Sequence, residues 1–103
     1  MDYLFDSSGH HIANRVGDQL HAPNGSNIGH WMQQEAIFID MRGRYLGEIV
    51  LSDRLLYHSA SPYRSVNFGN YGNYGNAGNY GNPGNHGSIG SQSGFVDVDA
   101  DWL

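Results

Sequence analysis

The feature that most constrains this chain is a short pattern that occurs four times in its first 68 residues. The pattern is clearest in residues 37–53, where an apolar run, an Asp-x-x-Gly turn and a second apolar run follow one another. This order is typical of a β-hairpin, because Asp40 can cap the turn with its carboxylate and Gly43 supplies the positive φ that the return needs.

The four copies align on a small turn residue, and the spacings between these residues are 16, 18 and 17. The turn residues are Gly9, Gly25, Gly43 and Ala60. The residues five positions before them are Leu4, Leu20, Phe38 and Leu55, and those three positions after them are Ile12, Ile28, Leu46 and Tyr63. A repeat of this length has room for a turn and two strands of about 5–6 residues. Such a unit cannot bury its apolar side alone, so the copies must share a core.

The repeat therefore predicts an all-β domain over residues 1–68, in which four hairpins form a shallow barrel with pseudo-four-fold symmetry. Closing the ring would leave no unpaired strand edge. The alternative is an ordinary antiparallel meander whose hairpins are similar by accident. We expect Asp6, Gly9, Gly25, Asp40 and Gly43 to be structural turn residues.

The tandem pattern over residues 2–68 resembles the four-fold β-flower family, small bacterial domains in which four hairpins form a flower-shaped barrel. The matching turns are Asp6-Ser7-Ser8-Gly9, Pro23-Asn24-Gly25 and Asp40-Met41-Arg42-Gly43. The fourth copy departs from the pattern at Tyr57-His58-Ser59-Ala60 and again at Pro62, so we expect its hairpin to be distorted. The resemblance implies a fold but no established chemistry. The family's likeness to Tubby-type domains suggests lipid contact only by analogy.

Size and charge limit the classes of partner. The chain has 103 residues, a net charge of −5, five arginines, no lysine and no cysteine. A negative charge argues against nucleic acid and anionic lipid surfaces as partners. A core of this size without disulfides is often supplemented by oligomerisation, so we expect a homo-oligomer. A protein or lipid partner stays open.

The amino-terminal sequence carries no basic segment followed by an apolar one, which predicts that there is no signal peptide. No apolar run approaches the length that spans a bilayer, so we expect no direct membrane insertion. The expected location is the cytoplasm.

A Gly-Asn-rich segment over residues 69–94 has glycine at every third position from 69 to 90. Three interpretations are open: a disordered low-complexity linker, an extended polyproline-II-type strand with one glycine edge, and a self-associating arm with Asn and Tyr ladders. In the second interpretation, the glycine edge permits close approach to another backbone.

Residues 95–103 are expected to form a strand that docks on the domain. Alternation places one group on a buried face: Val96, Val98, Ala100 and Trp102. It places Asp97, Asp99 and Asp101 on an acidic outer face. A calcium site on this face is disfavoured, because no glycine turn or distant glutamate accompanies the aspartates.

The repeat itself creates one polar set, at the position five residues after each turn residue. Its members are Asn14, His30, Glu48 and Ser65. If the ring closes, these residues are candidates for a polar circle around the axis that binds a small ligand or ion. The other interpretation is that they lie on the solvent face of their strands. No cysteine nucleophile, G-x-S-x-G elbow or H-E-x-x-H zinc motif is present.

These observations favour a small non-enzymatic bacterial module for binding or assembly, with no catalytic residues, metal or cofactor. The glycine-rich segment would serve as a flexible or self-associating arm. The alternative is a small-ligand or lipid-binding protein, and less readily a hydrolase, that uses the polar set or a cavity at the barrel axis.

Overall fold

The computed structural model describes residues 1–78, 80–99 and 103, and this part of the chain contains eight strands and one short 3-10 helix. The strands are β1 (Asp2–Phe5), β2 (His11–Val16), β3 (Gln19–His21), β4 (Asn27–Met32), β5 (Ile37–Asp40), β6 (Tyr45–Val50), β7 (Arg54–His58) and β8 (Phe95–Asp97). The helix is η1 (Pro62–Ser65). None of the described residues forms a helix with the length and apolar character needed to cross a membrane.

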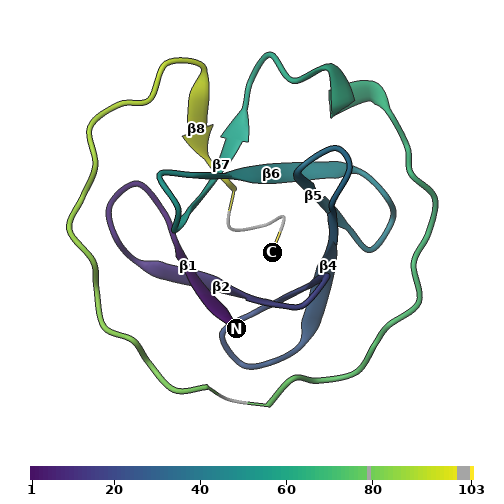
Figure 1. Cartoon of the computed structure of the whole chain (residues 1–103), viewed down its shortest axis with the longest axis horizontal. Helices are drawn as coiled ribbons and strands as arrows, with labels where there is room; N and C mark the ends of the chain where they lie inside the picture. The colour runs from purple at the N-terminus through teal and green to yellow at the C-terminus, as the bar shows by residue number, and fades with distance from the viewer. Residues whose placement is uncertain (79, 100–102) are drawn as a thin grey trace.

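Seven strands close into a barrel. Each strand from β1 to β7 pairs antiparallel with the next, and β1 also pairs in parallel with β7 through Phe5 and Arg54. The Phe5 N–H donates to the Asp53 carbonyl at 2.9 Å, which strengthens this closure. β8 adds to the outside of the ring as an antiparallel partner of β7 (Figure 1). The expectation of an all-β barrel is confirmed.

The hairpin turns obtain their shape from local hydrogen bonds. In the first copy, the Asp6 carboxylate accepts from the backbone N–H groups of Ser8 and His10. In the third copy, the Asp40 carboxylate accepts from the equivalent N–H groups of Arg42 and Arg44. Three turn glycines have φ values of 93°, 96° and 85°, in the region that residues with a side chain rarely adopt. These are Gly9, Gly25 and Gly43.

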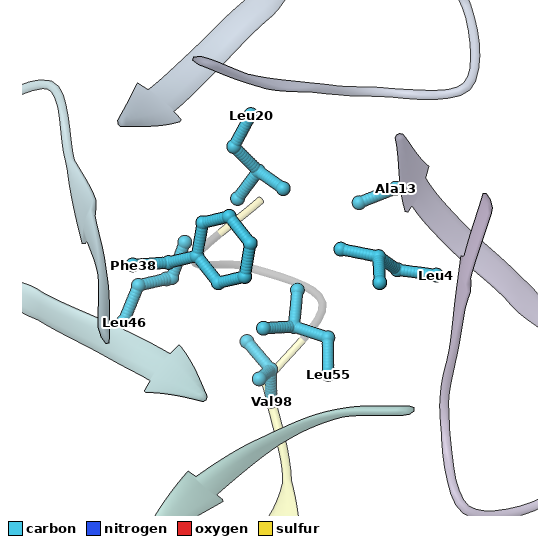
Figure 2. Packing of buried hydrophobic residues seen from close by; sticks show 7 residues of the cluster. All are labelled: Leu4, Ala13, Leu20, Phe38, Leu46, Leu55 and Val98. Carbon is cyan, nitrogen blue, oxygen red and sulfur yellow. The ribbon is translucent and has the colours of Figure 1, made fainter. Parts of the chain in front are cut away.

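The barrel interior is filled with apolar side chains. Figure 2 shows seven of them pointing toward one another, six from strands β1 to β7 and Val98 from the residue that follows β8: Leu4, Ala13, Leu20, Phe38, Leu46, Leu55 and Val98. Six of these come from the positions three to five residues from the repeated turn. The axis of the barrel is therefore apolar, because these side chains occupy it.

In the fourth copy, no second strand follows β7 directly along the chain. Pro62 starts the 3-10 helix η1, whose N-cap Ser61 accepts from the Tyr63 N–H, where the repeat predicts a returning strand. β8 pairs with β7 instead, with Leu56 opposite Asp97. The expected distortion at this copy is therefore the replacement of a local strand by one from the carboxyl end of the chain.

The carboxyl-terminal segment differs in part from its prediction. Val98 is buried in the core, but Val96 has 52% of its surface exposed, so the prediction that both lie on one buried face is wrong. The reason is that β8 ends at Asp97 and the chain turns inward at the next residue. The Asp97 carboxylate accepts from the backbone N–H and hydroxyl of Ser7. The predicted roles of residues 100–102 lie outside the described residues.

Residues 68–78 and 80–94, here called the belt, run around the outside of the barrel. Figure 1 shows the belt as a wide loop that surrounds the strands and leads into β8. The described belt residues belong to no helix or strand. The belt passes the hairpin turns in the reverse of their sequence order, from the third to the first.

The belt docks on the three turn glycines at a constant interval. The N–H groups of Phe68, Ala77 and His86 donate to the carbonyls of the turn glycines at 2.9, 2.8 and 2.9 Å. Their acceptors are Gly43, Gly25 and Gly9, respectively. Nine residues separate successive donors, so three Gly-Asn-x triplets span the step from one hairpin to the next.

The belt glycines do not support a polyproline-II strand. Gly69, Gly75, Gly78, Gly81 and Gly84 have φ between 80° and 87°, whereas polyproline II requires φ near −75°. Two Asn side chains accept from the N–H of the glycine two residues later. The Asn73 side chain accepts from the Gly75 N–H, and the Asn82 side chain accepts from the Gly84 N–H. Each of these is an Asx turn with glycine in the left-handed position, and a series of such turns lets the chain curve.

Candidate functional site

A hollow of about 590 Å³ opens on the flank of the barrel. Its walls come from the β2–β3 turn, the end of β4 with the turn that follows, and the first part of the belt. The belt contributes Tyr71 and Tyr74. The volume falls within the range of about 300–1,000 Å³ that is usual for sites of small organic ligands.

His30 is the most buried polar side chain of the hollow. It has 4% of its surface exposed, and its Nε2 atom is buried with no hydrogen-bond partner. Its ring lies 4.6 Å from the Tyr71 ring and 5.1 Å from the Tyr74 ring, the second pair edge to face. Burial of His30, and then the neighbouring His21, lower its pKa below the ordinary value. At neutral pH His30 is therefore an uncharged imidazole, whose Nε2 atom can donate or accept one hydrogen bond depending on the tautomer.

Other polar groups surround this imidazole. Asp18 and Glu35 place carboxylates in the lining, and Gln33 and Gln34 add amides. Among the described residues that line the hollow there is no arginine. The Arg15 guanidinium lies outside the lining, 4.7 Å from the centre of the Trp31 ring.

The structure brings only one of the four repeated polar residues to this hollow. Ala13, Gly29 and Gly47 stand opposite core residues, and strand alternation directs the next residues, Asn14, His30 and Glu48, to the outer face. They therefore surround the barrel on its outside and do not meet at the axis. Ser65 lies on η1 and is exposed.

The other two members of the set that lie on strands have local partners. The Asn14 Oδ1 atom lies 2.6 Å from His11 Nε2, while its Nδ2 atom is buried without a partner. Glu48 accepts from the Tyr45 hydroxyl at 2.6 Å. Burial of Tyr45, followed by this bond, raises the pKa of its hydroxyl. Asn14, like His30, thus has an unpaired nitrogen on the outer face of the barrel.

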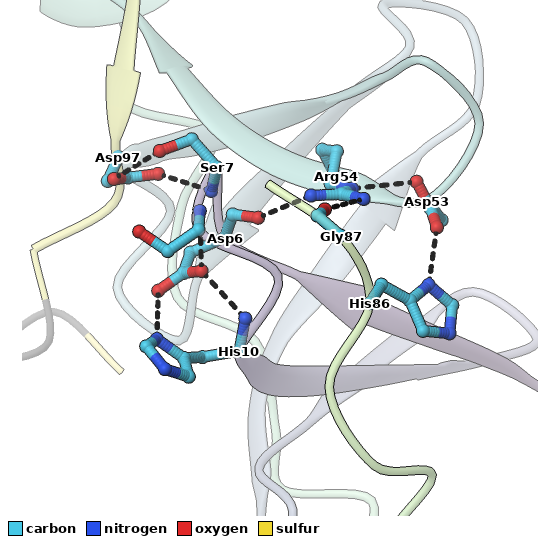
Figure 3. A network of polar contacts seen from close by, with 9 residues as sticks. Asp6, Ser7, His10, Asp53, Arg54, His86, Gly87 and Asp97 are labelled. Atoms are coloured by element: carbon cyan, nitrogen blue, oxygen red, sulfur yellow. Dashed lines mark hydrogen bonds and ion pairs between the residues drawn. The ribbon is translucent and has the colours of Figure 1, made fainter. Parts of the chain in front are cut away.

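A second polar cluster holds the belt near its end (Figure 3). Asp53 accepts from Arg54 at 3.0 Å and lies 2.9 Å from His86 Nδ1, and Arg54 also donates to the Gly87 carbonyl at 2.7 Å. Burial alone raises the pKa of Asp53, but the bonds from His86 and Arg54 outweigh it and leave the pKa below its usual value. The His86 ring stacks on Phe5 at 3.6 Å. This cluster fastens the belt to the barrel.

Sequence reasoning missed both tyrosines of the hollow, because it placed them in a low-complexity segment. The signal that could have found them is the third position of the triplets, which holds Tyr71, Tyr74 and Tyr80 in place of small residues. Their relation to His30 depends on the belt's docking interval, which no local pattern encodes.

The hollow offers hydrogen bonds and ring contacts, and its described lining contains no serine, threonine or cysteine nucleophile. Within the described residues, no group of three His, Asp or Glu side chains could hold a metal ion. Comparisons with protein-family models, curated proteins and solved structures found no match to this chain.

Proposed function

We propose that this chain is a small non-enzymatic binding module and that the flank hollow is its binding site. The observation that carries the proposal is the unpaired Nε2 atom of His30, buried in the wall of a hollow of ligand size. A buried polar atom without a partner lowers stability by about 1–3 kcal/mol, so it calls for a partner that the folded chain does not itself supply. A small ligand that reaches Nε2 meets that need.

The belt has a defined part in this function. Tyr71 and Tyr74 complete the hollow only while the belt is docked, and their backbone N–H groups bond to the Met41 carbonyl and the Asn27 side chain. The belt therefore builds one wall of the site, in place of the free arm that the sequence suggests.

Nuclear magnetic resonance on the full chain tests the proposal. A set of small neutral alcohols, amides and heterocycles is added, and the ring signals of His30 and Tyr74 are followed. We expect a subset to shift both signals, and His30→Ala to abolish that binding. His10→Ala is the matched control, because the His10 side chain is 65% exposed at a turn away from the hollow. Binding that survives in His30→Ala, or the absence of any shift at His30, contradicts the proposal.

We also propose that the closed barrel is the four-hairpin ring of the β-flower family. Four sequence copies support this architecture, as does the constant nine-residue interval of the belt. In this view β8 takes the place of the second strand of the fourth hairpin. A high-resolution crystal structure tests it: superposition of the four hairpin units by successive rotations of about 90° is the expected result.

Assembly by exchange is a second candidate function, favoured by one observation. Val98 enters the core only after the long belt, so the same carboxyl-terminal segment has the reach to dock on a second copy. The double variant Ser7→Cys and Asp97→Cys tests this with a short thiol cross-linker, because Ser7 Oγ lies 2.7 Å from Asp97 Oδ2 in the folded chain. Cross-linked dimers on a denaturing gel indicate exchange between copies. Cross-linked monomers alone, with a monomeric mass in light scattering, contradict it.

A further inference from the structure

We propose that the ligand of the flank hollow is a neutral polyhydroxylated ring, such as a single sugar unit. This inference rests on the proposed function, since it names the chemical class that the hollow accepts. Three properties of the lining support it: an exposed aromatic face beside His30, a mixture of hydrogen-bond donors and acceptors, and a negative charge that disfavours anions without an open cage of rings for a cation.

The aromatic face belongs to Tyr74. Its side chain is 63% exposed although its ring lies against His30 in an edge-to-face contact. The Trp31 ring is already in contact with Arg15 and with Phe38, and Tyr71 directs its hydroxyl to the Met32 sulfur at 3.6 Å. Tyr74 is thus the ring of the hollow most open to a ligand. The C–H face of a sugar ring is an apolar surface of matching size for such a platform.

The hydrogen-bonding groups suit a ligand whose hydroxyls both donate and accept. Gln33 and Gln34 carry amides that do both, and the carboxylates of Asp18 and Glu35 accept. The Gln19 Oε1 atom lies 3.0 Å from His21 Nε2, an arrangement that leaves the amide nitrogen of Gln19 to donate. His30, in the wall of the hollow, adds a buried Nε2 atom that has no partner within the folded chain. An apolar ligand would leave these groups without partners.

Charge argues against an anionic ligand, and the surroundings of the aromatic rings argue against a cationic one. An anionic ligand would face Asp18 and Glu35 with no cation among the described lining residues, on a chain of net charge −5. A cationic ligand would be attracted to the carboxylates. However, Arg15 already occupies the Trp31 face, and the available platform is a single tyrosine, in contrast to a cage of several rings. A neutral ring uses the polar groups without either conflict.

The test compares sugars that differ mainly in charge, on the full chain at pH 6.5. Glucose and maltose are the neutral probes, glucuronate is the anionic probe and glucosamine is the cationic probe. The ring signals of His30 and Tyr74 are followed by nuclear magnetic resonance at increasing probe concentration. We expect a neutral probe to shift both signals to saturation, and the anionic probe to shift neither.

Variants separate the platform from general effects on the belt. Tyr74→Ala should weaken the affinity for the neutral probe about two- to tenfold, which is the change in affinity expected from the loss of one aromatic contact. Tyr80→Ala is the matched control. It is also an exposed belt tyrosine and lies outside the hollow. Its backbone carbonyl accepts from the Tyr3 hydroxyl, and the substitution keeps that carbonyl. Equal weakening by both variants would overturn the platform role of Tyr74.

The outcomes distinguish failure of the ligand class from failure of the function. Binding of glucosamine alone, or of glucuronate, overturns the neutral class. Absence of binding by all four sugars, while neutral fragments still shift His30, overturns the sugar inference and leaves the binding module intact. Absence of any shift at His30 with sugars and fragments alike overturns both.

Discussion

The backbone N–H of His86 donates to the carbonyl of Gly9 at 2.9 Å, and the carbonyl of His86 lies in the space that a side chain on Gly9 would need. The same relation recurs where the Gly78 carbonyl lies 2.6 Å from the position of a Cβ on Gly25, and where the Gly69 carbonyl lies against Gly43. The turn glycines therefore serve two purposes. They allow the turn, and they leave room for the belt.

Gly9→Ala should destabilise the protein more than its turn conformation alone requires. A left-handed φ costs a residue with a side chain about 1–2 kcal/mol, and displacing the belt adds the loss of its docking bonds. We expect a decrease of about 3 kcal/mol in the free energy of unfolding, measured by urea denaturation. Gly17→Ala is the control, because its φ is 60° and no atom lies within 4 Å of its Cβ position. Equal effects of the two variants would show that the belt does not press on Gly9.

The belt glycines should behave differently from one another according to their φ. Gly75→Ala places a side chain at a φ of 83° and should lower stability by about 1–2 kcal/mol. Gly72 has open space around its Cβ position and no positive φ, so Gly72→Ala should be neutral or stabilising by about 0.4–1 kcal/mol. Thermal unfolding of the two variants checks this contrast. A loss at position 72 as large as that at 75 would contradict a belt built from left-handed glycines.

Much of the barrel could be predicted from the sequence, because local chemistry determines it. Asp40 caps its turn as its spacing suggests, and Leu4 and Phe38 are buried at equivalent positions of their copies. The belt could not be predicted in the same way. Its contacts with the barrel are largely backbone to backbone. The close approach that glycine permits occurs at the barrel turns, while the belt glycines from Gly69 to Gly90 have open space around their Cβ positions.

The candidate site could likewise be predicted only where local sequence determines it. His30 could be singled out from the repeat, since it shares a position with Asn14 and Glu48. Its orientation could not, because the bulges between β1 and β2 and between β3 and β4 shift the register that decides which side faces the core. Its tyrosine neighbours come from a segment with no apolar periodicity, so only the docked belt brings them to His30.

Val98 should contribute to stability as a core residue. Val98→Ala removes two buried methyl groups and leaves a cavity in the cluster that also contains Leu4 and Leu55, which should lower the free energy of unfolding by about 2 kcal/mol. Val96→Ala is the matched control: two residues away, 52% exposed, and expected to change stability by less than about 0.5 kcal/mol. Chemical denaturation compares them. A negligible effect of Val98→Ala would mean that the carboxyl-terminal segment does not complete the core.

Asp53 should stabilise the protein above its ordinary pKa and lose that contribution in acid. Its folded pKa lies below the ordinary value of 3.8, so the unfolded chain binds more protons over the interval between the two. Stability should therefore fall as pH decreases from about 4 through the folded pKa. Asp53→Asn should flatten this part of the curve, while Asp2→Asn, at an exposed position, should not. Unfolding curves between pH 5 and pH 2, in steps of about half a unit, measure the difference.

His30 should produce a separate loss of stability at a higher pH. Its folded pKa lies below the ordinary value of 6.5 because burial disfavours the imidazolium, so the unfolded chain gains a proton first as pH falls. The free energy of unfolding should therefore decrease from about pH 7 downward, until the pH passes the folded pKa. His30→Gln should remove this decrease, and His10→Gln, with its exposed side chain, should retain it. Urea denaturation of all three proteins between about pH 7.5 and pH 4.5 gives the answer. A stability of the wild-type chain that is constant over this interval would show that His30 titrates alike in the folded and unfolded chains, and that its burial against Tyr71 and Tyr74 does not persist in solution.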